Sequence, residues 1–120
     1  MRVVAAAAVL LLVAPLLVAE GQVPSPFMDG EELKEGLEAW DSSWGSLFSD
    51  RTLDSGIAFG FVVGVADALD KEAFCLPVGL TRARLKDVVL QHLREHPDPG
   101  DRRASHLTIA ALEAAFPCKP

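Results

Sequence analysis

Basic residues and cysteines are both scarce in this sequence of 120 residues, and each scarcity excludes a class of protein. There are 11 Lys+Arg against 17 Asp+Glu, which gives a formal net charge of −6 at pH 7. Because affinity for DNA or RNA comes mainly from clusters of Lys and Arg, the acidic balance argues against a nucleic-acid partner. Two cysteines cannot form a four-cysteine zinc site. A chain of this length makes one domain with a modest core, too small for a two-domain enzyme.

Apolar residues make up 50% of the chain and are concentrated at its N-terminus. Arg2 precedes an apolar run that ends at Ala19. A basic start, an apolar stretch and a final small residue predict a secretory signal peptide over residues 1–19, cleaved after Ala19 or after Gly21. The alternative is an uncleaved anchor, but the run is at the lower limit for spanning a bilayer and Pro15 interrupts it. We therefore expect an exported chain whose mature form has no membrane span.

Export places the two cysteines where disulfides persist. Cys75 and Cys118 are then most simply one bridge. A bridged cysteine supplies no thiolate, so neither residue is expected to be a nucleophile.

The beginning of the mature chain predicts a leader and then a helix. Residues 20–28 contain two prolines and are interpreted as a flexible leader, so the folded domain is expected over 29–120. Asp29, with Glu32 three residues later, is a predicted N-cap. The apolar face that follows consists of Leu33, Leu37 and Trp40. Residues 41–51 are predicted to form a loop.

The stretch 52–69 is the most apolar part of the mature chain. Its β-branched residues alone would permit a buried strand. Its length and the apolar residue at every fourth position favour a central helix instead, with the stripe Leu53, Ile57, Phe61 and Val65. Gly60 and Gly64 would favour helix dimerisation in a membrane, but the apolar segment between Asp54 and Asp67 is too short to span one. We therefore predict that the two glycines let another backbone pack closely.

The C-terminal half predicts two more helices. Thr81 is an expected N-cap for a helix that Pro97 ends, with an apolar stripe of Leu85, Val88, Val89 and Leu93 opposed by Arg82, Lys86, Gln91 and Arg94. Asp98 and Pro99 are expected to cap the last helix, whose body over 102–116 is apolar on most sides and so mostly buried. The predicted fold class is all-α, a compact bundle of about four to five helices with one disulfide.

Two patterns resemble enzyme motifs, and neither is expected to act as one. The segment from His92 to His96 fits His-x-x-Glu-His, the pattern of inverted zinc metallopeptidases. Pro97 places His96 on a fraying last turn, and the domain is too small for a substrate cleft, so incidental metal binding is favoured over catalysis. Ser105 and His106, with Asp101, cannot form a triad because adjacent helical residues point in different directions. No metal or other cofactor is expected.

Four acidic residues lie along the first predicted helix: Glu31, Glu32, Glu35 and Glu38. They most simply form a solvated helix face. The functional alternative is a negative patch that steers a basic partner.

Four further segments follow one another along the chain: Gly60–Ala68, Phe74–Pro77, Thr81–Pro97 and Ala104–Cys118. In this order they resemble the Rap/Tai family of small exported immunity proteins of type VI secretion systems. The resemblance covers about residues 57–118, most of the mature domain.

The resemblance implies a periplasmic helical domain, often homodimeric, that is not an enzyme. Such proteins bind a secreted peptidoglycan amidase effector and block its catalytic cleft. The family pattern matches Cys75 and Cys118 to a structural bridge. This chain departs from it by lacking a second cysteine pair near Gly36 and Ala58, and by having Phe61 where Tyr is usual.

Occlusion of a cleft requires a protruding loop and no chemistry of its own. The candidate partner-binding residues are Pro97, Asp98, Pro99, Gly100 and Asp101. Two prolines hold such a loop rigid, which reduces the entropy lost on binding. The alternative function is a periplasmic helical binding or scaffold module with an unrelated protein partner.

Overall fold

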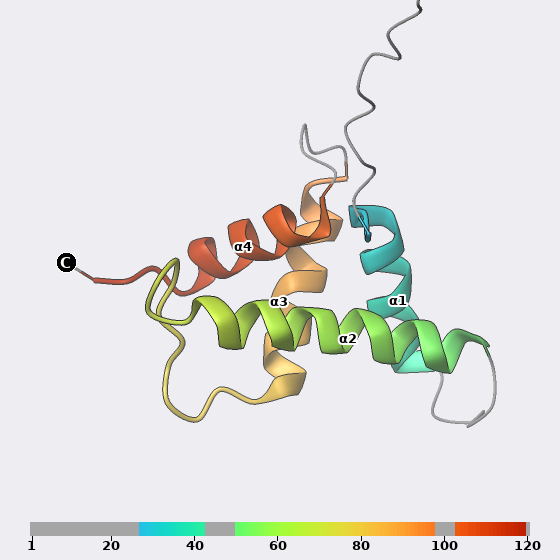
Figure 1. Cartoon of the computed structure of the whole chain (residues 1–120), viewed down its shortest axis with the longest axis horizontal. Coiled ribbons are helices and arrows are strands. Elements are labelled where there is room, and N and C mark those ends of the chain that lie inside the picture. Colours follow the sequence, from blue (N-terminus) through green and yellow to red (C-terminus); the bar gives the residue numbers. More distant parts are fainter. Residues whose placement is uncertain (1–26, 43–49, 98–102, 120) are drawn as a thin grey trace, which may run out of the picture.

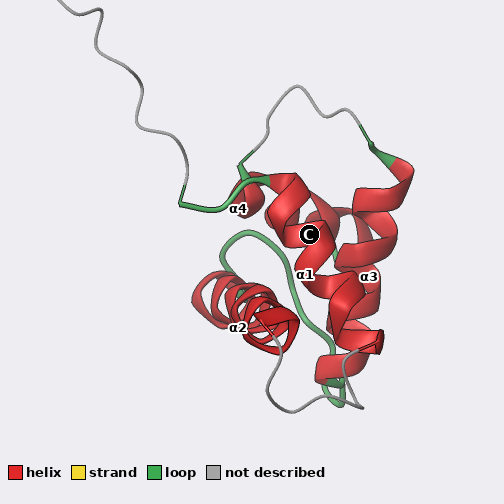
Figure 2. Cartoon of the chain, turned by 90° about the vertical axis from the view of Figure 1, so that its right-hand side faces the viewer, coloured by secondary structure: helices red, strands yellow, loops and turns green. Residues whose placement is uncertain are grey.

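The computed structural model describes residues 27–42, 50–97 and 103–119. In these residues the chain forms four α-helices and no strand: α1 (Gly30–Ser42), α2 (Asp50–Leu69), α3 (Arg82–Glu95) and α4 (Ala104–Ala115). Helix α1 packs mainly against α2, and α3 mainly against α4. Helices α1 and α3 run across the direction of α2 (Figure 1), which is seen nearly end-on in Figure 2. The all-α prediction is confirmed. The predicted signal peptide lies outside the described residues.

One hydrophobic core is shared by all four helices and by Phe74 of the α2–α3 connection. Its apolar side chains are almost completely removed from solvent: Leu33, Leu37, Ala58, Val62, Ala66, Phe74, Leu85, Val89, Leu90, Leu93, Ala104, Leu107, Ala111 and Leu112. Burial of such side chains is the main favourable term in folding, so each helix depends on the others for its stability.

Helix α1 begins at the predicted capping box. The Glu32 N–H donates to Asp29 Oδ1 over 2.9 Å, and the Asp29 N–H donates to Glu32 Oε2 over 3.0 Å. These two bonds satisfy backbone donors that the first helical turn leaves without partners. Trp40 stacks on Phe59 of α2 with ring centroids 4.7 Å apart. The predicted loop 41–51 is shorter than expected, because α1 continues to Ser42 and α2 begins at Asp50.

The predicted stripe of α2 lies only partly on its buried face. Leu53 and Ile57 are 66% and 51% exposed, whereas Phe61 is half-buried and packs against the core. The fully buried positions are Ala58, Val62 and Ala66. Both sets recur every four residues, and the helix is apolar around most of its circumference, so periodicity could not select between them. At Ala58 the side chain is small because α1 lies very close to α2 there, at Gly36.

The prediction that Gly60 and Gly64 let a backbone pack closely is wrong within the described chain. Both glycines are exposed, and a Cβ added to either would meet nothing within 4 Å. The close approach is at Gly36 of α1, where a Cβ would lie 2.5 Å from the Ala58 Cβ and 3.0 Å from the Asp54 carbonyl oxygen. Gly36 therefore sets the distance between α1 and α2.

By length and composition alone, the part of α2 from Arg51 to Leu69 could cross a membrane, with a mean hydropathy of 1.4. A core helix passes the same test, and α2 contributes Ala58, Val62 and Ala66 to the core. We therefore interpret α2 as a core helix with one exposed apolar face. The absence of a membrane span from the mature chain stays a prediction.

The connection between α2 and α3 is fixed by Cys75 at its centre. Asp70 Oδ1 accepts from the Leu76 N–H over 2.8 Å, and the Cys75 N–H donates to the Phe116 carbonyl oxygen over 2.8 Å. The predicted disulfide between Cys75 and Cys118 is confirmed. The bridge ties the residues before α3 to those after α4.

Helix α3 has the predicted cap, and one residue of its predicted polar face is buried. The Arg84 N–H donates to Thr81 Oγ1 over 3.2 Å. Leu85, Val89 and Leu93 face the core as predicted. Lys86, predicted to face solvent, is 4% exposed, and its Nζ lies 3.1 Å from the Asp87 carboxylate.

Helix α4 is buried along one face only. The N-cap position is Arg103, extended at φ −71° and ψ 125°, so the helix begins at Ala104 and not at Arg102. The predicted cap at Asp98 and Pro99 lies outside the described residues. The exposed residues Ala110, Ala114 and Ala115 contradict burial on most sides, because only one face of α4 packs against other described helices.

Replacing Thr108 by valine is expected to stabilise the fold by about 1 kcal/mol, measured by urea unfolding. Thr108 is fully buried in α4, and its hydroxyl has no hydrogen-bond partner among the described residues. Removing a buried polar group without a partner relieves its desolvation penalty, while valine keeps the side-chain shape. Thr108→Ser keeps the hydroxyl and removes a buried methyl, so it should destabilise. A Thr108→Val variant less stable than the wild type would show that the hydroxyl is satisfied.

Candidate functional site

The predicted partner-binding loop joins α3 to α4. Helix α3 ends at Glu95, the His96 N–H donates to the His92 carbonyl oxygen over 3.0 Å, and Pro97 is exposed. Proline cannot continue the helical ladder, so the chain must leave the helix axis here. Asp98, Pro99, Gly100 and Asp101 lie outside the described residues, and their predicted role in binding stays a prediction.

The other end of this loop is attached to the beginning of α1. Arg103 pairs with Asp29 in an isolated antiparallel bridge, and the Ala104 N–H donates to the Met28 carbonyl oxygen over 3.1 Å. Figure 1 shows the start of α4 beside the start of α1. The described residues on both sides of the α3–α4 connection are therefore held by backbone hydrogen bonds.

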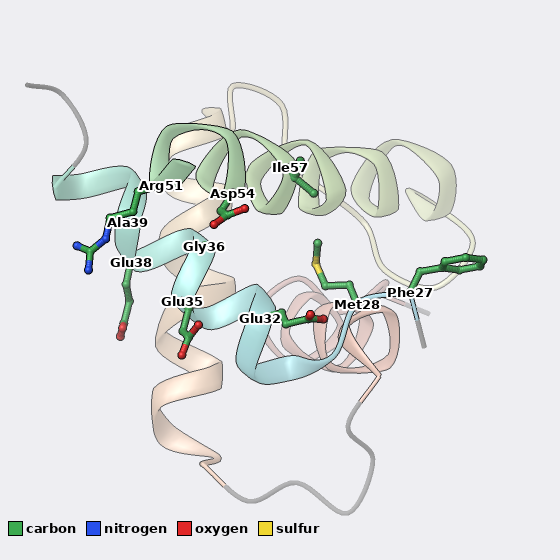
Figure 3. A pocket seen from close by; sticks show the side chains of 10 residues that line it. All are labelled: Phe27, Met28, Glu32, Glu35, Gly36, Glu38, Ala39, Arg51, Asp54 and Ile57. Carbon is green, nitrogen blue, oxygen red and sulfur yellow. The ribbon is translucent and has the colours of Figure 1, made fainter. Parts of the chain in front are cut away.

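A groove of about 760 Å³ lies between α1 and α2, next to Met28. Figure 3 shows its lining side chains, which come from the segment before α1, from α1 and from the first half of α2. We call this the α1–α2 groove, and its lining residues are Phe27, Met28, Glu32, Glu35, Gly36, Glu38, Ala39, Arg51, Asp54 and Ile57. The sequence did not predict this groove, because its two walls come from helices that a predicted loop separates along the chain. The only signal was the spacing of the α1 carboxylates.

The groove is acidic on balance. Four carboxylates line it, from Glu32, Glu35, Glu38 and Asp54, against one guanidinium from Arg51. Glu38 is paired with Arg94 of α3, whose Nε lies 3.1 Å from Glu38 Oε1. Glu31, Glu32 and Glu35 are exposed, as both the solvated face and the negative patch require. Three of the groove's carboxylates therefore remain outside ion pairs among the described residues.

The His-x-x-Glu-His segment forms the end of α3. The rings of His92 and His96 stack with centroids 4.2 Å apart, and His96 Nδ1 lies 2.9 Å from the His92 carbonyl oxygen. Glu95 accepts from the Gln91 side chain over 2.8 Å. Among the described residues no group of three His, Cys, Asp or Glu side chains could hold a metal ion. The segment therefore serves as a helix end in the structure.

Stability is expected to fall as the pH drops below 6.5, in part because of His92. Burial lowers the pKa of His92 below its usual 6.5, repulsion from His96 lowers it further, and Glu95 acts in the opposite direction. The unfolded chain therefore binds a proton at a higher pH than the folded chain does. The contribution of neutral His92 to the free energy of unfolding is fully present above pH 6.5. It is lost as the pH falls through the pKa that His92 has in the folded chain.

The His92→Gln variant, unfolded in urea at several pH values between 7.5 and 5, is expected to lose less stability than the wild type over this range. His106→Gln is the control, because His106 is exposed on α4. An equal loss of stability in the wild type and in His92→Gln would contradict the assignment of this pH dependence to His92.

The family of this chain follows from one comparison. A model of the family described as Rap1a immunity proteins matches residues 30–118, from the first residue of α1 to the second cysteine of the disulfide. No curated protein matches the chain. The matched region contains all four helices and both cysteines. The chain therefore belongs to the family of Rap1a immunity proteins.

Proposed function

We propose that this protein is exported to the periplasm and there binds a peptidoglycan amidase effector of a type VI secretion system, blocking its catalytic cleft. The observation that carries the proposal is the family match over residues 30–118, since an immunity protein acts on a partner effector. The apolar N-terminus supports export. The effector class comes from the resemblance to Rap/Tai proteins.

Inhibition by binding requires a scaffold that does not rearrange. The disulfide closes a segment that contains both α3 and α4, and the bridge between Asp29 and Arg103 fixes one end of the α3–α4 loop. A surface held in its bound shape loses little conformational entropy on association. These described contacts near the predicted contact loop, Pro97–Asp101, support the proposal that the loop acts by occlusion.

The proposed mechanism assigns no catalytic residue to this chain. Cys75 and Cys118 are bonded to each other, and a disulfide sulfur is not a nucleophilic thiolate. Protection is then stoichiometric, so one inhibitor domain neutralises one effector. The homodimer expected from the resemblance stays a prediction, and light scattering of the purified chain tests it.

Titration calorimetry with a panel of purified type VI amidases tests the contact loop. The double variant Asp98→Lys/Asp101→Lys is expected to weaken binding about tenfold or more, because it reverses two charges in the predicted contact loop. The matched control is Glu72→Lys/Glu113→Lys, which reverses two exposed charges elsewhere and should bind as the wild type does. If the loop variant bound with wild-type affinity, the loop would not be part of the interface. Failure to bind any amidase would contradict the effector class.

A further inference from the structure

Exposed apolar side chains gather at the α1–α2 groove. Four large apolar residues are fully or mostly exposed in the described chain: Phe27, Leu53, Ile57 and Val78. Phe27 and Ile57 line the groove, and Leu53 lines a second, shallower hollow that shares Ile57 with it. Single exposed apolar residues are ordinary on protein surfaces, but a cluster beside a cavity is typical of an interaction site.

The charges around the groove define the chemistry of its occupant. Glu35 of α1 and Asp54 of α2 both line the groove (Figure 3), and neither has an ion pair among the described residues. Lys and Arg side chains can lay their aliphatic stems on an apolar floor while their charged ends reach carboxylates. An acidic rim on an apolar floor therefore complements a segment that carries both basic and apolar residues.

From this complementarity we infer that the α1–α2 groove binds a basic, amphipathic segment of a partner protein. The floor is rigid, because the contact of Gly36 with Ala58 holds α1 and α2 at a fixed distance. Met28 lines the groove and accepts a hydrogen bond from Ala104, so the site adjoins the base of the α3–α4 connection. Pro97 does not line the groove, and the inference does not depend on the effector being an amidase.

A synthetic 16-residue peptide with leucine and lysine at helical spacing is the probe, and its binding to the full mature chain is followed by fluorescence anisotropy. The double variant Glu35→Lys/Asp54→Lys is expected to weaken binding about tenfold or more, because two attractive contacts become repulsive. Ile57→Ser is expected to weaken binding severalfold without changing the net charge. Binding to the wild type should decrease as salt is added.

Two controls distinguish binding at the groove from attraction of the peptide to the overall negative charge of the protein. Glu72→Lys/Glu113→Lys changes the net charge equally at exposed sites that do not line the groove, and it should retain the wild-type affinity at 0.15 M salt. A peptide with glutamine in place of every lysine should not bind. Equal weakening by both double variants, or no binding of the lysine peptide to the wild type, would overturn the inference. Neither outcome bears on amidase binding, which is measured separately with loop variants.

Discussion

Replacing Cys75 and Cys118 by serine is expected to lower the free energy of unfolding by about 4 kcal/mol. The two residues are 43 positions apart, and opening a loop of that length restores conformational entropy to the unfolded chain. The loop contains α3 and α4, which contribute most of the leucines that are buried in the described part of the chain. A loss of this size is a large share of the stability of a small domain.

Thermal unfolding with and without a reductant measures this effect. The double serine variant is expected to melt about 20 °C below the oxidised wild type, and reduced wild type should match the variant. The variant itself should not respond to the reductant, which controls for other effects of the reagent. An oxidised wild type that melts with the double variant would show that the bridge contributes little.

Replacing Gly36 by alanine is expected to destabilise the protein by about 2 kcal/mol, although alanine has the higher helix propensity. The added methyl group would lie 2.5 Å from the Ala58 Cβ and 3.0 Å from the Asp54 carbonyl oxygen. Neither atom is the end of a flexible side chain, so α1 and α2 would have to separate. The free-energy cost of such overpacking exceeds the gain in helix propensity.

Gly60→Ala is the matched control, because Gly60 lies within α2 and its added methyl group would meet no atom within 4 Å. This variant is expected to stabilise the protein by about 0.5–1 kcal/mol, the usual difference between alanine and glycine in a helix. Urea unfolding of the two variants should therefore give changes of opposite sign. Stabilisation by Gly36→Ala would show that the two helices are not in close contact at this position.

Features that depend on local sequence were predictable. The capping box needs only Asp29 and Glu32, three positions apart, and the Thr81 cap needs only the helix that follows it. The disulfide followed from there being two cysteines in a chain expected to be exported. In each case the interaction is nearly fixed by residue type and spacing.

Features that depend on how helices meet were not predictable. Helix α2 is apolar around most of its circumference, so the choice between Leu53 and Ala58 for the core is made by the proximity of α1 at Gly36. The sequence also does not show which glycine lies where two helices meet. Close packing was therefore predicted at Gly60 and Gly64, whereas the structure has it at Gly36. The α1–α2 groove is built from residues on both sides of the α1–α2 connection, and only its acidic character was visible along the chain.

Lysis of a bacterial host that exports a type VI amidase to its periplasm tests the proposed immunity function most directly. Co-expression of the full-length chain is expected to prevent lysis by at least one amidase of the panel and to leave the amidase in a stoichiometric complex. A version without residues 1–19 should fail to protect, because it would not reach the periplasm. Undiminished lysis with every amidase, and no amidase recovered with the chain, would contradict the proposed function.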